Sequence, residues 1–108
     1  MKKPIFDFSY NWNNKLDCQF FTTFRLHNPQ KHILNMECEV YLKGHHHKNG
    51  KIADVRKMTL AQVNPFIAGL DAGYDVASFQ KIVRTMYSKK VPDVETALFD
   101  LVLIQTVP

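Results

Sequence analysis

Apolar and polar residues alternate along several short stretches of the chain, which is the pattern of strands with one buried face. The first 17 residues alternate aromatic and polar positions, which predicts a short extended segment and then a turn or brief helix near residues 13–17. Further strands are predicted at residues 18–26, 36–43 and 51–58, and the apolar run over residues 97–107 predicts a central last strand.

Helical spacing appears only between the last two of these strands. The apolar residues between 75 and 88 recur at offsets 0, 3, 4, 7 and 8, which predicts an amphipathic helix with Asp75 as its N-cap. Thr59 and Gln62 have the spacing of a capping box and predict a helix start. Pro65, preceded by Asn64, either begins a second short helix or kinks the first.

The polar segment 44–50 separates two of the predicted strands. It ends in Asn49–Gly50, a pair that favours a tight hairpin turn with positive φ. The elements add up to four or five strands with two or three helices inserted before the last strand. We therefore expect residues 1–108 to form a single α+β domain whose sheet curls into a small β-barrel.

Composition is that of one globular domain. The chain has 108 residues, of which 45% are hydrophobic and 22% charged. A net charge of +4 favours an acidic partner such as nucleic acid or a nucleotide, although many soluble domains carry as much. No apolar run approaches the roughly 20 residues of a membrane span, and no signal-peptide pattern is present, so we expect a cytoplasmic protein without a membrane partner.

The chain contains two cysteines, Cys18 and Cys38, which are too few for a disulfide framework and lack a metal-binding spacing. Both lie in apolar strand patterns and are expected to be reduced thiols in the core. The motifs typical of dinucleotide enzymes, P-loop NTPases, zincins and common serine hydrolases are missing from the sequence. No cofactor is expected.

The predicted strand around Phe20–Leu26 carries the most distinctive polar groups. Because side chains alternate between the faces of a strand, Thr23 and Arg25 share one face with Phe21. A hydroxyl beside a planar guanidinium suits a phosphate, a carboxylate or a base edge. The alternative is a solvated strand face without function.

Four segments, taken in order, resemble the ASCH domain of the PUA-like superfamily, and together they cover most of residues 15–107. They are Thr23-Phe24-Arg25, the strand and turn Val40 to Gly44, Ile52 to Val55 running into Thr59-Leu60, and Phe79 to Tyr87. The resemblance implies a PUA-like β-barrel with a cleft beside the strand of the T-x-R motif. It also implies an association with RNA and modified nucleosides.

The resemblance also implies a possible catalytic activity. Some ASCH proteins are amidohydrolases that remove the acyl group of N4-acetylcytidine with a lysine three residues before the motif threonine, that threonine and a downstream acidic residue. The threonine corresponds to Thr23, the acid to Asp71 and the lysine position to Phe20. A phenylalanine can neither accept a proton nor stabilise an oxyanion, which argues against an enzyme. Lys15 would reach the cleft only through an unusual turn.

The sequence thus favours a module that binds RNA, a nucleotide or a modified nucleoside. Arg25 is expected to clamp a phosphate or pair with a base edge, while Thr23 supplies a short hydrogen bond. Trp12 or Tyr41 is expected to stack on a base, and lysines such as Lys43 to steer the acidic ligand.

Two other functions stay open. One is an amidohydrolase or nuclease of the same fold with Thr23 and Asp71 in its site, and the other is a protein-interaction domain. The oligomeric state is open too. His45, His46 and His47 suggest metal binding, but adjacent loop residues do not easily face one ion, so no dedicated metal site is expected.

Overall fold

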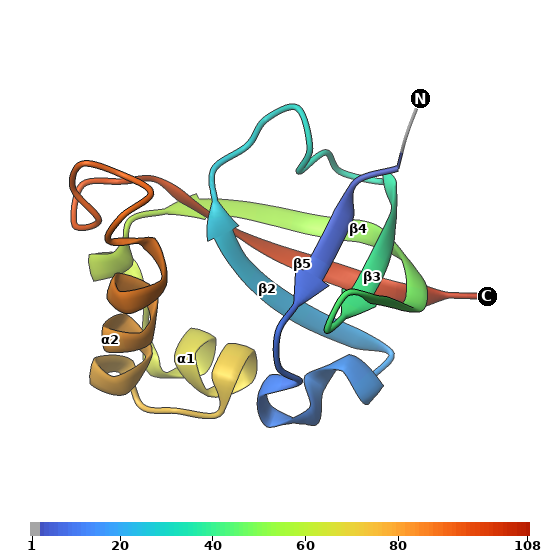
Figure 1. Cartoon of the computed structure of the whole chain (residues 1–108), viewed down its shortest axis with the longest axis horizontal. Coiled ribbons are helices and arrows are strands. Elements are labelled where there is room, and N and C mark those ends of the chain that lie inside the picture. The colour runs from blue at the N-terminus through green and yellow to red at the C-terminus, as the bar shows by residue number, and fades with distance from the viewer. Residues whose placement is uncertain (1–2) are drawn as a thin grey trace.

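A curled sheet with helices packed against one half of it makes up the structure, a computed structural model that describes residues 3–108 (Figure 1). The five strands are β1 (Ile5–Phe8), β2 (Phe20–Leu26), β3 (Glu37–Leu42), β4 (His45–Met58) and β5 (Phe99–Val107). The α-helices are α1 (Pro65–Ala72) and α2 (Val76–Tyr87), and the 3₁₀ helices are η1 (Trp12–Asp17) and η2 (Leu60–Gln62).

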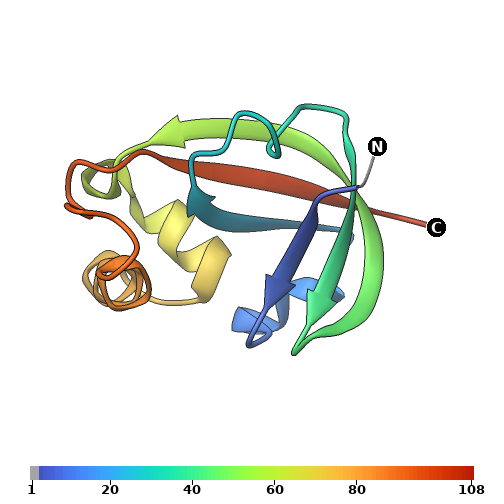
Figure 2. The same cartoon turned by 45° about the horizontal axis from the view of Figure 1, so that its top comes forward.

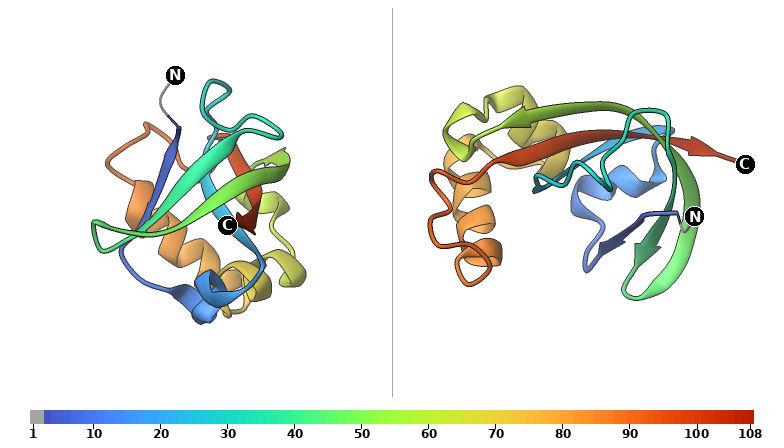
Figure 3. Two further views of the ribbon diagram at one scale, coloured as in Figure 1. Left: turned by 90° about the vertical axis from the view of Figure 1, so that its right-hand side faces the viewer. Right: turned by 90° about the horizontal axis from the view of Figure 1, so that it is seen from above.

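The strands follow one another in the order β1-β3-β4-β5-β2. The β1–β3 pair is parallel and the other pairs are antiparallel. Strand β4 bends along its length and carries the sheet from the half under the helices to the half with β1 and β3 (Figures 2 and 3). Irregular registers at Val40/Tyr41 and Ile52/Asp54 accompany this bend, as β-bulges commonly do. The predicted α+β class with a curled, barrel-like sheet is confirmed.

The hairpin between β3 and β4 turns six residues earlier than the sequence indicated. Lys43 and Gly44 form the turn, with φ angles of 53° and 79°. The predicted turn at Asn49–Gly50 is wrong, because both residues lie inside β4. Gly50 serves a different purpose there: a Cβ on it would lie 2.6 Å from Ile104 Cγ2. The glycine therefore permits a close approach between backbone and core rather than a turn.

Both α-helices begin at the caps that the sequence predicted. The Asn64 side chain accepts a hydrogen bond from Ile67 N at 2.9 Å, and the Asp75 side chain accepts one from Ser78 N at 2.7 Å. Pro65 thus starts a helix and does not kink one. The residue before a proline favours extended backbone, and Asn64 is extended, so the preceding η2 helix is only three residues long.

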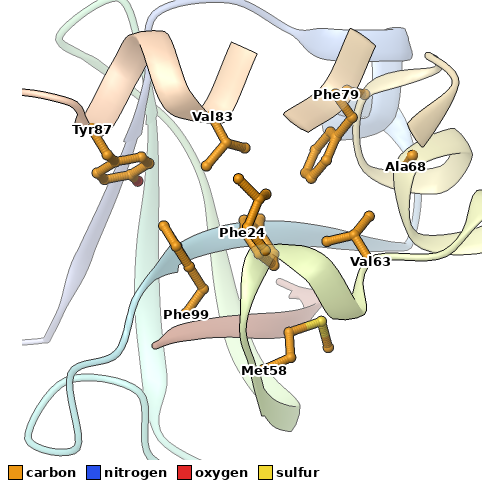
Figure 4. Close-up of a cluster of buried hydrophobic side chains, with 10 residues drawn as sticks. Phe24, Met58, Val63, Ala68, Phe79, Val83, Tyr87 and Phe99 are labelled. Carbon is orange, nitrogen blue, oxygen red and sulfur yellow. The ribbon is translucent and has the colours of Figure 1, made fainter. Parts of the chain in front are cut away.

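Two hydrophobic clusters fill the molecule and meet at β2. The helix-side cluster contains Phe24, Met58, Leu60, Val63, Ala68, Ala72, Phe79, Val83, Tyr87 and Phe99 (Figure 4). The barrel-side cluster contains Phe6, Phe8, Leu16, Phe21, Cys38, Val40, Ile52, Val102 and Ile104. Consecutive stretches of β2 therefore serve both cores.

One cysteine differs from expectation. Cys38 is buried in the barrel-side cluster, but Cys18 is exposed. The prediction of a core thiol is wrong for Cys18 because β2 begins only at Phe20. Within residues 3–108, no helix has both the length and the apolar character needed to cross a membrane.

Candidate functional site

A cleft of about 100 Å³ opens where the two hydrophobic clusters meet, beside β2. Its apolar wall includes Phe8, Trp12, Phe79, Val83 and Met86. Its polar groups come from five elements or their ends: Asp7, Ser9, Lys15, Thr23, Arg25, Asp71 and Tyr87. The cleft is large enough to admit water or one small group of a larger ligand.

Thr23 and Arg25 lie in this cleft and contact each other. Arg25 Nε donates to Thr23 Oγ1 at 2.9 Å, which confirms that the two side chains share a face. Arg25 Nη2 donates to the backbone oxygen of Asp7 at 2.9 Å, and the guanidinium lies 4.8 Å from the centroid of the Phe8 ring. Two of its five N–H donors are thus bonded within residues 3–108, and three are left for a ligand.

A lysine and an aspartate form a buried ion pair in the same cleft. Lys15 Nζ lies 3.0 Å from Asp71 Oδ1, and the side chains are 6% and 9% exposed. Thr22 Oγ1 donates to the same carboxylate oxygen at 2.8 Å. Burial lowers the pKa of Lys15, and the attraction and hydrogen bond of Asp71 oppose that shift only in part.

A left-handed turn places Lys15 in the cleft. Asn13 and Asn14 adopt φ angles of 57° and 54°, a conformation that asparagine tolerates better than most residues. Asn11 Oδ1 accepts a hydrogen bond from Leu16 N at 2.9 Å, and Asn13 Nδ2 donates to Gly69 O of α1 at 3.3 Å. The η1 segment is therefore fixed against α1, the helix that carries Asp71.

Lys15 is the main cleft residue that was not predicted from the sequence. Phe20, at the expected lysine position, is 50% exposed and does not line the cleft. Lys15 reaches the cleft through an unusual turn, the requirement that had argued against its presence there. The signal was present in the pair Asn13–Asn14, since two consecutive asparagines are typical of left-handed turns.

The other predicted ligand residues are divided between the cleft and the β3–β4 hairpin. Trp12 lines the cleft, whereas Tyr41 and Lys43 do not. The Tyr41 ring packs edge-on against His46 at 5.6 Å, and Lys43 N donates to Phe8 O at 2.7 Å. Residues 45–47 are exposed on β4, and no three histidine, cysteine or acidic side chains of the described chain are placed to hold a metal ion.

Tyr87 is a cleft residue that the sequence assigned to the core alone. Its side chain belongs to the helix-side cluster and also lines the cleft. Burial raises the pKa of the Tyr87 hydroxyl, which the positive charge of Arg25 partly offsets. The hydroxyl is therefore a neutral hydrogen-bond donor at physiological pH. Helical periodicity could predict that Tyr87 faces inward, but it could not predict that the side chain also lines a cleft.

Comparisons of the chain with models of known families, with curated proteins and with solved structures found no significant match.

Proposed function

We propose that the protein binds RNA, a nucleotide or a nucleoside, with one group of the ligand held in the cleft beside Thr23 and Arg25. The observation that carries this proposal is the position of Arg25, which lines a concave site with three N–H donors left over. The cleft also has apolar lining that includes Trp12. A planar base with a polar edge matches such a combination, because its faces pack on aromatic groups while its edge forms hydrogen bonds.

The resemblance of the T-x-R strand to ASCH domains supports the same proposal. That resemblance implied a cleft beside this strand, and the structure has a cleft there. A curled five-stranded sheet is compatible with a small barrel of the PUA-like kind.

Fluorescence of Trp12 tests the proposal directly, because it is the chain's single tryptophan and lies in the cleft. Uridine, cytidine, N4-acetylcytidine and single-stranded RNA decamers are titrated separately at several salt concentrations. RNA held through two to four phosphate contacts gives a slope of log affinity against log salt of roughly −1.5 to −3. A nucleoside gives almost no slope. If no probe binds, the proposal fails and a protein-interaction domain becomes the better explanation.

A second candidate, hydrolysis of an amide bond such as that of an N4-acylcytidine, is favoured by one specific observation. Lys15, Thr23 and Asp71 line the same cleft, so the three residue types that the resemblance implied are together, with Lys15 as the lysine. The Thr23 hydroxyl accepts from Arg25 and keeps its own O–H. In this reaction water adds to the acyl carbon, the C–N bond breaks and the amine leaves with a proton.

The assay follows conversion of N4-acetylcytidine to cytidine by chromatography. Thr23→Val and Lys15→Met are expected to abolish turnover under conditions in which thermal melting shows both variants folded, because Lys15→Met also breaks the buried ion pair with Asp71. Lys43→Met, outside the cleft, is the matched control. Turnover that persists in both cleft variants identifies a contaminant, and no turnover by the unaltered protein leaves the binding function alone.

A further inference from the structure

The charges that line the cleft cancel. Lys15 and Arg25 are cations and Asp71 is a buried anion, while Asp7 adds a second negative charge at the exposed edge, where its carboxylate accepts from Gly44 N at 3.4 Å. Arg25, the cation with unused donors, thus shares the cleft with the carboxylate of Asp71 and lies near the charge of Asp7. A phosphate placed there would be attracted by Arg25 but repelled by Asp7 and Asp71. It would also lose its hydration on entering the cleft. An uncharged polar group avoids both costs.

Two further polar atoms are open to the cleft. Asp71 receives both of its protein hydrogen bonds, from Lys15 and Thr22, on Oδ1, which leaves Oδ2 as a free acceptor within the described chain. Tyr87 is 8% exposed, and its hydroxyl has no hydrogen-bond partner in residues 3–108. Since every fully buried polar side-chain atom of the described residues has a partner, these two atoms are reached by solvent, and the cleft is the cavity that both residues line.

Tyr87 and Arg25 both line the cleft. Burial raises the pKa of the Tyr87 hydroxyl, while the charge of Arg25 works to lower that pKa and the charge of Asp71 works to raise it further. Tyr87 lies at one end of the helix-side cluster (Figure 4), while Arg25 enters from β2. The cleft therefore offers a neutral donor from Tyr87, a cationic donor from Arg25 and a carboxylate acceptor from Asp71.

We propose that Tyr87 is a specificity-determining residue, an inference that rests on the binding function proposed above. Together with Arg25, the Tyr87 hydroxyl donates a hydrogen bond to a carbonyl oxygen of an uncharged planar ligand group. Asp71 Oδ2 accepts an N–H of the same group. The group is an amide-type edge of a nucleobase, and phosphate stays outside the cleft. This assignment explains why an arginine suited to phosphate shares its cleft with the carboxylate of Asp71.

The experiment compares Tyr87→Phe with Tyr41→Phe, which removes the same hydroxyl from a tyrosine outside the cleft. Affinities for uridine, cytidine and N4-acetylcytidine are read from Trp12 fluorescence. Tyr87→Phe is expected to weaken the tightest of these about three- to tenfold, the effect of one hydrogen bond, while Tyr41→Phe changes nothing. The same factor is expected for an RNA decamer of that base, because the contact is to the base. Thermal melting of both variants verifies the fold.

Two additional measurements separate the possible failures. In the double variant Arg25→Lys/Tyr87→Phe the loss is expected to be smaller than the product of the two single losses, because both groups serve one oxygen. Inorganic phosphate in large excess is expected to displace no nucleoside. Nucleoside binding that Tyr87→Phe leaves unchanged, or that phosphate abolishes, overturns the inference and keeps the binding function. Absence of nucleoside and RNA binding in the unaltered protein overturns the binding function itself.

Discussion

The amine of Lys15 lies 3.0 Å from the carboxylate of Asp71, and 56 residues separate the two in the chain. Both side chains are largely buried. The contact joins η1 to α1 and brings Lys15 beside the T-x-R strand. It is therefore both a structural link and the feature that adds a second cation to the cleft.

Loss of one partner should destabilise the protein more than loss of both. Lys15→Met leaves a buried carboxylate without its counter-charge and is expected to lower the free energy of unfolding by about 3–5 kcal/mol. Lys15→Met/Asp71→Asn leaves no uncompensated charge and should recover most of that loss. Urea denaturation of the single and double variants measures the coupling. Equal destabilisation in the single variant and the double variant would show that Lys15 and Asp71 are not coupled.

Arg25→Ala should weaken nucleoside or RNA binding by about 1–3 kcal/mol, since the fork of donors is removed. Arg25→Lys should restore part of the affinity only, because a point charge cannot reproduce the planar geometry. Trp12 fluorescence provides the binding curve, and Arg56→Ala, at an exposed position on β4, is the control. Full affinity in the alanine variant would remove Arg25 from the site.

Gly50→Ala should destabilise the fold by about 1–3 kcal/mol, because the added Cβ would lie 2.6 Å from Ile104 Cγ2 inside a packed core. Gly69→Ala is the matched control. No atom lies within 4 Å of a Cβ at that position, and it is in the interior of α1, so the change should be neutral or stabilising by up to about 1 kcal/mol. Chemical denaturation of both variants decides.

Acid should destabilise the protein through a buried cluster around Asp100, which is 1% exposed. Its carboxylate accepts hydrogen bonds from His32 Nδ1 at 2.7 Å, His27 Nδ1 at 2.9 Å and Asn28 N at 3.0 Å. Burial works to raise the pKa of Asp100, but these hydrogen bonds outweigh it and the net shift is downward. Burial also lowers the pKa of His32 below 6.5, against the pull of Asp100.

Both shifts have the same consequence for stability. A pKa lowered by folding means that the unfolded chain binds more protons, so stability rises with pH and is lost as the pH is lowered. The free energy of unfolding should be greatest above about pH 6.5 and should decline below it, first as His32 and then as Asp100 takes up a proton. His32→Asn keeps a donor to Asp100 and should flatten the first decline, whereas His47→Asn should not. Denaturation curves from pH 4 to 8 show whether this holds.

The sequence determined the elements because their signals are local. The helix starts at Asn64 and Asp75 follow from side chains that cap backbone groups three residues away. The shared face of Thr23 and Arg25 follows from the alternation of a strand. These relationships involve neighbours in the chain, so no knowledge of packing was needed. The α+β class followed from the order of the same elements.

Tertiary structure alone decided which residues meet. Gly50 looked like a turn residue because its pair with Asn49 is typical of hairpins, but the approach of Ile104 requires a glycine there for a different reason. Lys15 was separated from the T-x-R strand by a segment whose path depends on Asn13 binding to α1. Contacts between residues 50 or more positions apart depend on how the two cores pack against β2. Strand or helix periodicity describes neighbours in the chain and contains no information about such contacts. The cleft lies where those cores meet, which is why its second cation and Tyr87 appeared only in three dimensions.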